Sequence, residues 1–170
     1  MWLRMLLSSL VVLELLPLVA DTHAQERPTI ITNATTRLYL IRAIDGAIRR
    51  LEASSCQQVF REFTATSGAS LESVLAEAEL SPRAALSRIR FVDGSQTPQC
   101  QTHGDAIAAY TAPGYHVIFV CSDRFATRYR DQPKAAQMLV IHELLHTLGL
   151  GENPPASGEI TARVTKRCGA

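Results

Sequence analysis

Two histidines and a glutamate near residue 140 have the spacing of a metal-binding site. His142 and His146 are four residues apart, so on a helix both imidazoles project from one face and can hold a single zinc ion. Glu143 follows the first histidine and lies about 100° further round the helix. Its carboxylate can reach a water on the metal, take a proton from that water and pass the proton to a leaving amine. The three residues therefore predict zinc-assisted hydrolysis with Glu143 as the general base.

The segment around these residues is expected to form the helix that the spacing requires. Pro133 suits the first turn of a helix, and the residues that follow it, KAAQMLVIHELLHTL, are mostly good helix formers. Gly149 suits a left-handed C-terminal cap that ends the helix. Leu144, Leu145 and Leu148 would give the helix an apolar face that buries the histidines.

The segment HELLHTLGLGE, residues 142–152, resembles the active-site helix of the zincin metallopeptidases and is closest to the metzincin pattern HExxHxxGxxH. In metzincins the glycine turns the chain so that the residue three positions later meets the metal. Gly149 and Glu152 match these two places, although Glu152 stands where metzincins have a histidine. The resemblance implies a zincin-like catalytic domain that binds Zn²⁺ through His142, His146 and Glu152. It also implies a secreted zinc metalloendopeptidase that acts on a peptide or protein substrate.

A second acidic residue is an alternative third ligand. Gluzincins place a glutamate on a second helix, and Glu159 begins the last helix expected in this chain. There is also a looser likeness: AYTAPGYHVIFVC, residues 109–121, is similar to the segment before the active helix of the deuterolysin-like fungal peptidases. That likeness supports a β-hairpin and a disulfide between Cys100 and Cys121, and it does not supply the third ligand.

Residues 1–24 have the features of a signal peptide. Arg4 gives a positive start, an apolar run follows that is short for a membrane span, and the small residues that end at Ala24 resemble a cleavage site. Cleavage after Ala20 and an uncleaved N-terminal anchor are the alternatives. Residues 25–170 are then expected to form one domain that is secreted or periplasmic, with no membrane attachment after signal removal.

Four cysteines, all outside the expected signal peptide, predict two disulfides in an exported chain. Three connectivities are possible. A hairpin about residues 113–114 would bring the region of Cys100 close to Cys121, which favours the Cys100–Cys121 pairing. That pairing leaves Cys56 and Cys168, which would tie the C-terminus to an early helix.

The charge of the chain argues against two classes of partner. Its formal net charge is +1, and its basic residues are dispersed along the sequence. A nucleic-acid-binding protein or a polybasic membrane protein would concentrate basic residues on one face. We therefore expect no nucleic-acid partner.

The remaining pattern predicts an α+β fold with helices at its N-terminal end. Residues 25–36 are expected to be an extended or loose lead-in, and a helical period begins at Arg37. The apolar stripe of that helix is expected to contain Leu38, Ile41, Ile44, Ile48 and Leu51. Two further helices are expected, one around residues 56–63 and one from about Ser70 that ends at Ser81-Pro82.

A small sheet is expected in the middle of the chain. Residues 89–92 suit a short strand, and residues 106–111 and 115–121 suit a β-hairpin that turns at Pro113-Gly114. After the active-site helix, Ser157 can begin a short C-terminal helix. In zincins the strand before the active helix borders the cleft and receives the substrate on its edge, so the resemblance implies that residues 115–121 supply that edge.

Two other functions remain open from the sequence. One is a secreted, disulfide-stabilised binding protein with a structural or vestigial metal site, in which a fourth protein ligand would close the coordination sphere. The other is a zinc hydrolase that acts on a substrate other than a peptide, because the helix fixes the water and not the substrate.

Overall fold

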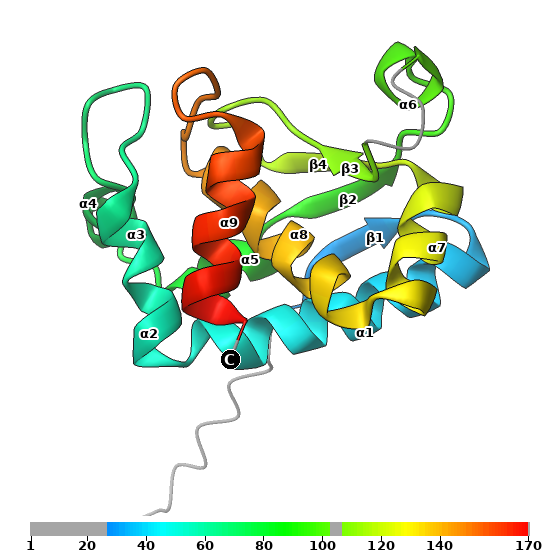
Figure 1. The fold of residues 1–170 in the computed structure, drawn as a ribbon, viewed down its shortest axis with the longest axis horizontal. Coiled ribbons are helices and arrows are strands. Elements are labelled where there is room, and N and C mark those ends of the chain that lie inside the picture. Colours follow the sequence, from blue (N-terminus) through cyan, green and yellow to red (C-terminus); the bar gives the residue numbers. More distant parts are fainter. Residues whose placement is uncertain (1–26, 103–106, 170) are drawn as a thin grey trace, which may run out of the picture.

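The computed structural model describes residues 27–102 and 107–169 as a small α+β domain, as the sequence predicts (Figure 1). The expected signal peptide lies outside this described part. The helices are α1 (Ala34–Leu51), α2 (Ser54–Gln57), α3 (Val59–Glu62), α4 (Leu71–Glu77), α5 (Pro82–Ser87), α6 (Pro98–Thr102), α7 (Ser122–Asp131), α8 (Pro133–Thr147) and α9 (Ser157–Cys168). The strands are β1 (Thr29–Ile31), β2 (Arg90–Asp93), β3 (Ala109–Tyr110) and β4 (Val117–Val120).

The described strands form one mixed sheet in the order β1-β2-β4-β3. β1, β2 and β4 are parallel neighbours, whereas β3 runs antiparallel to β4. The antiparallel pair is the expected hairpin, with Tyr110 opposite Phe119. Its first arm is shorter than predicted, because β3 contains two residues. β1 lies in the segment expected to be an extended or loose lead-in, and its pairing with β2 makes it part of the sheet.

One face of the sheet packs against helices. Phe91, Ile118 and Val120 point to that face and are buried, while Val92 and Phe119 alternate with them and are half-buried. This alternation is typical of a sheet with one covered face. Figure 1 shows α1, α7 and α8 together on the covered side.

Helix α8 is the central helix of the domain, since α1, α7 and α9 all pack against it. Every residue from Val140 to Thr147 is buried. A helix that is buried on all sides lies in the core rather than on its surface. The polar side chains in this part of α8 therefore lie inside the domain, away from bulk solvent.

The buried face of α1 differs from the expected stripe. Leu38 is 48% exposed, and small residues such as Ala43 and Ala47 are fully buried. Helices α7 and α8 approach this face closely, and a Cβ on Gly46 would lie 2.4 Å from the Gln137 side chain. Ile44 and Leu51 of the expected stripe are buried as predicted. The stripe was wrong for Leu38 because it gave weight to large apolar residues, whereas close helix packing here uses small ones.

Two other helix predictions need correction. The helix expected around residues 56–63 is divided into α2 and α3. Ser81-Pro82 was expected to end a helix, but it begins one: the Ser81 side chain accepts a hydrogen bond from Ala84 N, and Pro82 occupies the first turn of α5. Proline is favoured there because a first-turn N–H has no partner within its own helix. Helix α7 was not predicted at all.

Two disulfides hold the domain together, with the pairing expected from the sequence. Cys56 in α2 is bonded to Cys168 at the end of α9, and Cys100 in α6 is bonded to Cys121, which lies between β4 and α7. Disulfides of this kind indicate an oxidising, extracytoplasmic environment. Within the described residues, no helix has both the length and the apolar character needed to cross a membrane.

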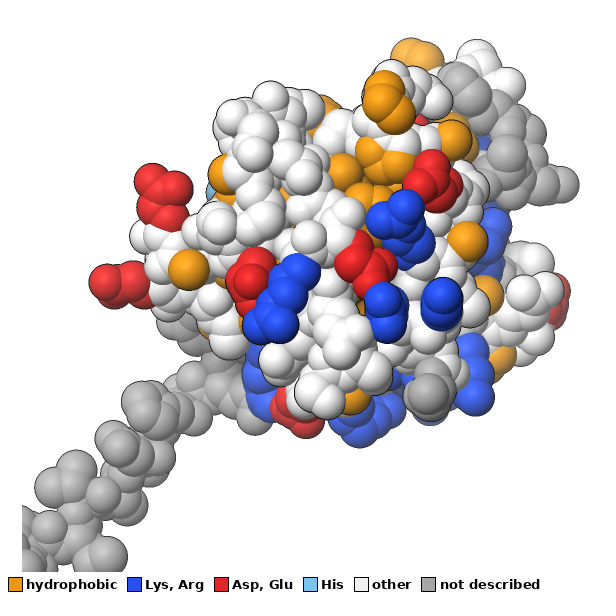
Figure 2. Space-filling model, turned by 60° about the vertical axis from the view of Figure 1, so that its left-hand side comes forward, with side chains coloured by type: hydrophobic (Ala, Val, Ile, Leu, Met, Phe, Trp, Pro, Cys, Tyr) orange, Lys and Arg blue, Asp and Glu red, His pale blue; other side chains and the backbone are white. Residues whose placement is uncertain are grey.

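The surface carries both signs of charge. Across the middle of the face in Figure 2, acidic and basic side chains are interspersed. Two ion pairs involve α9: Arg163 Nη2 lies 2.9 Å from Glu159 Oε1, and Arg167 pairs with Glu62.

Candidate metal centre

Helix α8 carries His142, Glu143 and His146 into the interior of the domain. Their exposed fractions are 4%, 4% and 5%. The helix begins at Pro133, as expected, and ends at Thr147. Because residues four apart lie one above the other on a helix, both imidazoles point to the same side of α8.

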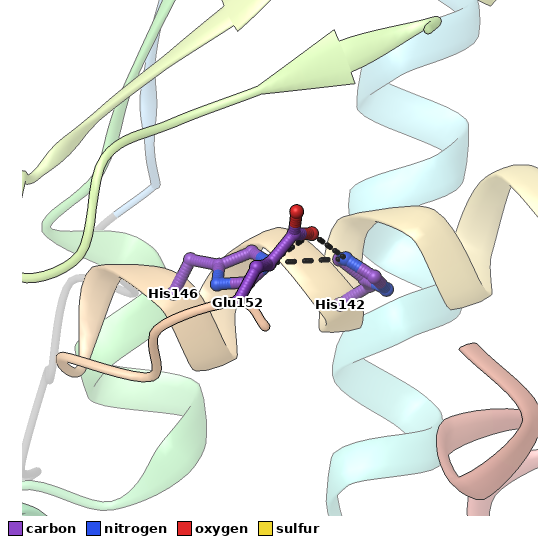
Figure 3. Close-up of side chains that lie close together, drawn as sticks. All are labelled: His142, His146 and Glu152. Carbon is purple, nitrogen blue, oxygen red and sulfur yellow. Dashed lines mark hydrogen bonds and ion pairs between the residues drawn. The ribbon is translucent and has the colours of Figure 1, made fainter. Parts of the chain in front are cut away.

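Three side chains converge at one point (Figure 3). His142 Nε2 lies 3.0 Å from His146 Nε2, and Glu152 Oε1 lies 3.8 Å and 3.4 Å from these nitrogens, respectively. In a tetrahedral zinc site with bonds of about 2.0–2.2 Å, the ligand atoms are about 3.3–3.6 Å apart. The observed separations bracket that range, so the donor set fits a metal ion with small adjustments. Among the described residues, this is the one group of His, Cys, Asp or Glu side chains that could hold such an ion.

The far nitrogens of both rings also have partners. His146 Nδ1 lies 2.7 Å from the Leu150 carbonyl oxygen. A carbonyl can only accept, so Nδ1 carries the hydrogen and Nε2 presents its lone pair to the cluster. His142 Nδ1 lies 3.0 Å from the Thr161 hydroxyl, which can donate or accept. Both rings are thus oriented with Nε2 toward Glu152.

The turn after α8 brings Glu152 back to the histidines. Gly149 has a φ of 102°, which is the left-handed region that favours glycine and the cap expected there. Gly149 O accepts a hydrogen bond from Thr66 N at 2.8 Å, and Leu150 forms an isolated β-bridge with Ala65. The segment after α3 therefore fixes the turn from which Glu152 projects.

The Glu143 carboxyl group lies beside this cluster and is only partly satisfied. The backbone N–H of Thr111 donates to it, and its Oε2 atom is buried with no hydrogen-bond partner among the described residues. Burial raises the pKa of Glu143 to about 8, and the negative charge of Glu152 adds to the rise, whereas the Thr111 hydrogen bond opposes it. An unpartnered buried carboxyl oxygen is costly, so its position next to three side chains that can bind a metal suggests a site built for a further occupant.

His142 shows the opposite effect. Burial lowers the pKa of His142 to about 4, and the neighbouring His146 adds to the decrease. A neutral imidazole is the form that binds metal, because the ligand nitrogen must present a lone pair. The buried position therefore keeps His142 in its ligand form at neutral pH.

A cavity of about 470 Å³ opens onto the cluster. It is lined by His142, Glu143, His146 and Glu152, by Ser157 at the start of α9, and by residues of and around β3, namely Ile107, Ala109, Tyr110, Thr111 and Pro113. The cluster therefore has an open side, bordered by a strand.

The strand at the cavity is not the one expected. Residues 115–121 were expected to offer a free edge, but β4 is paired with β2 on one side and β3 on the other. The Thr111 hydroxyl, just after β3, also donates to Val117 O at 2.6 Å. This carbonyl of β4 is therefore occupied as well. The prediction was wrong because the hairpin folds β3 over β4, which leaves β3 as the edge strand beside the cavity.

The alternative third ligand lies elsewhere. Glu159 pairs with Arg163 on the exposed side of α9 and is not part of the cluster. Sequence reasoning missed two contributors, the Thr161 hydroxyl and the Thr111 N–H. Neither had a sequence signal, because the first depends on how α9 packs against α8 and the second on the register of the hairpin.

Comparisons of this chain with protein-family models, with curated proteins and with solved structures find no match. The zincin resemblance consequently rests on the residues of the motif, and a function must be argued from the site itself.

Proposed function

We propose that this protein is a secreted zinc-dependent metallopeptidase that hydrolyses peptide bonds. The observation that carries the proposal is the buried Oε2 of Glu143, which has no hydrogen-bond partner in the described part of the chain and lies beside three converging donors, His142, His146 and Glu152. A general base and an open metal site are the two components that metal-assisted hydrolysis requires.

Zinc is the ion that best suits the donor set. Two imidazoles and one carboxylate form a typical catalytic zinc site, which keeps its fourth position for water or substrate. A closed structural site would need a fourth protein ligand, and the described residues bring three donors to the cluster. A three-donor site supports a hydrolase rather than a binding protein with a structural metal.

Each residue has a defined task in the reaction. Zinc held by His142, His146 and Glu152 would supply Lewis acidity, which lowers the pKa of a coordinated water and polarises the scissile carbonyl. The Glu143 carboxylate accepts the proton of the attacking water and passes it to the leaving amine. The pKa of Glu143 would fall beside a bound cation, since opposite charge favours the carboxylate, so the base would be ionised when it is needed.

The edge of β3 supports a peptide as the substrate. This short strand borders the cavity, and its outer edge has no strand neighbour among the described residues. An extended peptide can add to such an edge through main-chain hydrogen bonds, which hold the scissile bond in place without reading its sequence. A small-molecule substrate has no extended main chain and could not form these hydrogen bonds with the strand.

Replacing Glu143 by Gln tests the proposal. We expect Glu143→Gln to lower the rate of peptide cleavage by about 10²–10⁴-fold and to retain zinc, because Glu143 is not a ligand. The assay is cleavage of a mixture of unstructured peptides, followed by mass spectrometry, together with zinc analysis of the same samples. Glu159→Gln is the matched control and should cleave like the wild type. Full activity of Glu143→Gln would contradict the mechanism.

A further inference from the structure

We propose that Thr161 is a positioning residue that orients His142 for metal binding, so that helix α9 forms part of the metal centre. This inference rests on the metal site of the proposed function and concerns its assembly. Thr161 lies one turn into α9, and its Oγ1 atom is 3.0 Å from His142 Nδ1.

The two ligand histidines are held in different ways. His146 Nδ1 is paired with a backbone carbonyl, that of Leu150, which is present whatever side chain residue 150 carries. His142 Nδ1 is instead paired with a side chain, that of Thr161. The orientation of His142 therefore depends on the identity of residue 161.

Metal binding fixes the direction of this hydrogen bond. If Nε2 of His142 binds an ion, its hydrogen must be on Nδ1, and Nδ1 then donates to the Thr161 oxygen. The His142 ring is only 4% exposed, whereas Thr161 lies at the exposed surface of α9, so its hydroxyl reaches Nδ1 from the solvent side. Partners of this kind fix the tautomer and ring orientation of a metal-binding histidine.

The hydroxyl also suits the site before an ion binds. His146 presents a lone pair at Nε2, so the 3.0 Å contact between the two Nε2 atoms is a hydrogen bond if His142 carries its hydrogen there. His142 Nδ1 then needs a donor, and a hydroxyl can donate as well as accept. Thr161 can thus partner His142 in both states by reversing its role.

The position of Thr161 is set by the packing of α9. The adjacent Ile160 and, one turn later, Val164 are completely buried, and α9 is among the helices that contact α8. The disulfide from Cys168 to Cys56 anchors the other end of the helix. The hydroxyl therefore comes from a rigid element, as precise orientation of a ligand requires.

Zinc affinity measured by competition with a chromogenic chelator tests this inference on the mature, oxidised chain. The variants are Thr161→Val, which keeps the shape and loses the hydroxyl, Thr161→Ala as a second variant without a hydroxyl, and Thr161→Ser, which keeps the hydroxyl. Thr165→Val is the matched control, because Thr165 lies one turn further along the same helix and is exposed like Thr161. Thermal unfolding in EDTA shows whether the metal-free variants keep the wild-type stability.

We expect Thr161→Val and Thr161→Ala to weaken zinc binding by about 10–100-fold. Thr161→Ser and Thr165→Val should bind zinc like the wild type. The inference is overturned if Thr161→Val binds as tightly as the wild type, or if Thr161→Ser binds as weakly as Thr161→Val, since the methyl group would then be responsible.

The same measurements separate this inference from the proposed function. If zinc binding follows the expected order but no peptide is cleaved, Thr161 retains its role and the peptidase proposal fails. If the wild type and Thr161→Val bind zinc equally and both cleave peptides, the peptidase proposal stands and the role of Thr161 is wrong.

Discussion

At the level of single residues, the interior of the domain favours the neutral forms of two neighbouring groups on α8. Burial raises the pKa of Glu143 to about 8 and lowers the pKa of His142 to about 4. Both shifts have the same cause, since a low-dielectric environment disfavours charge. In the metal-free protein, the shift of Glu143 lowers the free energy of unfolding as pH rises, and the shift of His142 lowers it as pH falls.

The pKa of Glu143 predicts a pH-dependent difference between the wild type and Glu143→Gln in EDTA. The pKa of this carboxyl group in the unfolded chain is near 4.5. Below that pH the group is protonated in both the folded and the unfolded state, so it does not lower the free energy of unfolding. As pH rises toward 8, ionisation favours the unfolded state, so the wild type loses stability and the glutamine variant does not. One pKa unit corresponds to about 1.4 kcal/mol, so we expect Glu143→Gln to gain roughly 1–3 kcal/mol over the wild type between pH 5 and pH 8.

Urea denaturation at several pH values measures this difference. His142 acts in the other direction, because its lowered pKa costs stability as pH falls from about 6.5 to about 4. That contribution is common to both proteins and cancels when their unfolding free energies are subtracted. A difference that stays constant from pH 5 to pH 8 would contradict the account of Glu143.

The site residues that the sequence could predict are those at fixed offsets from one another in the chain. His142, Glu143 and His146 follow from helical geometry, and Glu152 follows from the motif. Thr161 is 19 residues from its partner His142 and has no fixed offset from it. Such contacts arise from the packing of one helix on another and cannot be seen in a sequence without the fold.

At the level of elements, the turn between α8 and α9 determines where Glu152 lies. Gly149 adopts a φ of 102°, and a Cβ at this position would lie 3.1 Å from the Ala65 Cβ. Gly149→Ala therefore combines backbone strain with a tight contact, and we expect it to cost about 1–3 kcal/mol of unfolding free energy. We also expect weaker zinc binding, because the displaced turn would carry Glu152 away from the histidines.

The same substitution at another glycine provides the control. Gly158 lies in the first turn of α9, has no positive φ, and a Cβ there would meet nothing within 4 Å. Gly158→Ala should keep wild-type zinc affinity and be at least as stable, since alanine is the better helix former. Equal effects of the two substitutions on stability and zinc affinity would show that the turn does not position Glu152.

Elements with a strong local signal were predicted well. Helix α8 has a proline at its start and a glycine after its end, and the hairpin turns at Pro113-Gly114 into β4, which is rich in β-branched residues. β1 and α7 lacked such signals. β1 is three residues long and forms through parallel pairing with β2, which is distant in sequence. Half of the ten residues of α7 are charged, and in the sequence they resemble a solvated surface rather than a packed helix.

At the level of the whole molecule, the two disulfides close loops of very different length. Cys56 and Cys168 are 112 residues apart, whereas Cys100 and Cys121 are 21 apart. If chain entropy dominates, the longer loop contributes about 5 kcal/mol and the shorter about 3 kcal/mol. Removing Cys56–Cys168 by paired alanine substitutions should therefore destabilise the protein more than removing Cys100–Cys121.

Guanidinium denaturation of the two double variants in EDTA compares these contributions without the effect of metal. The Cys56–Cys168 variant should also bind zinc more weakly, because α9 carries Thr161 and loses its C-terminal anchor. If the Cys100–Cys121 variant is the less stable of the two, the entropic account of these bonds is wrong for this domain.

The metal content of the oxidised, mature protein decides whether this fold holds a zinc centre. After expression with zinc and dialysis, elemental analysis should find about one zinc per chain, as one ligand set requires. The double variant His142→Ala/His146→Ala should contain none. A folded wild-type protein with both disulfides formed and no bound zinc would contradict the account, and His142, Glu143 and His146 would then be only the buried end of a helix.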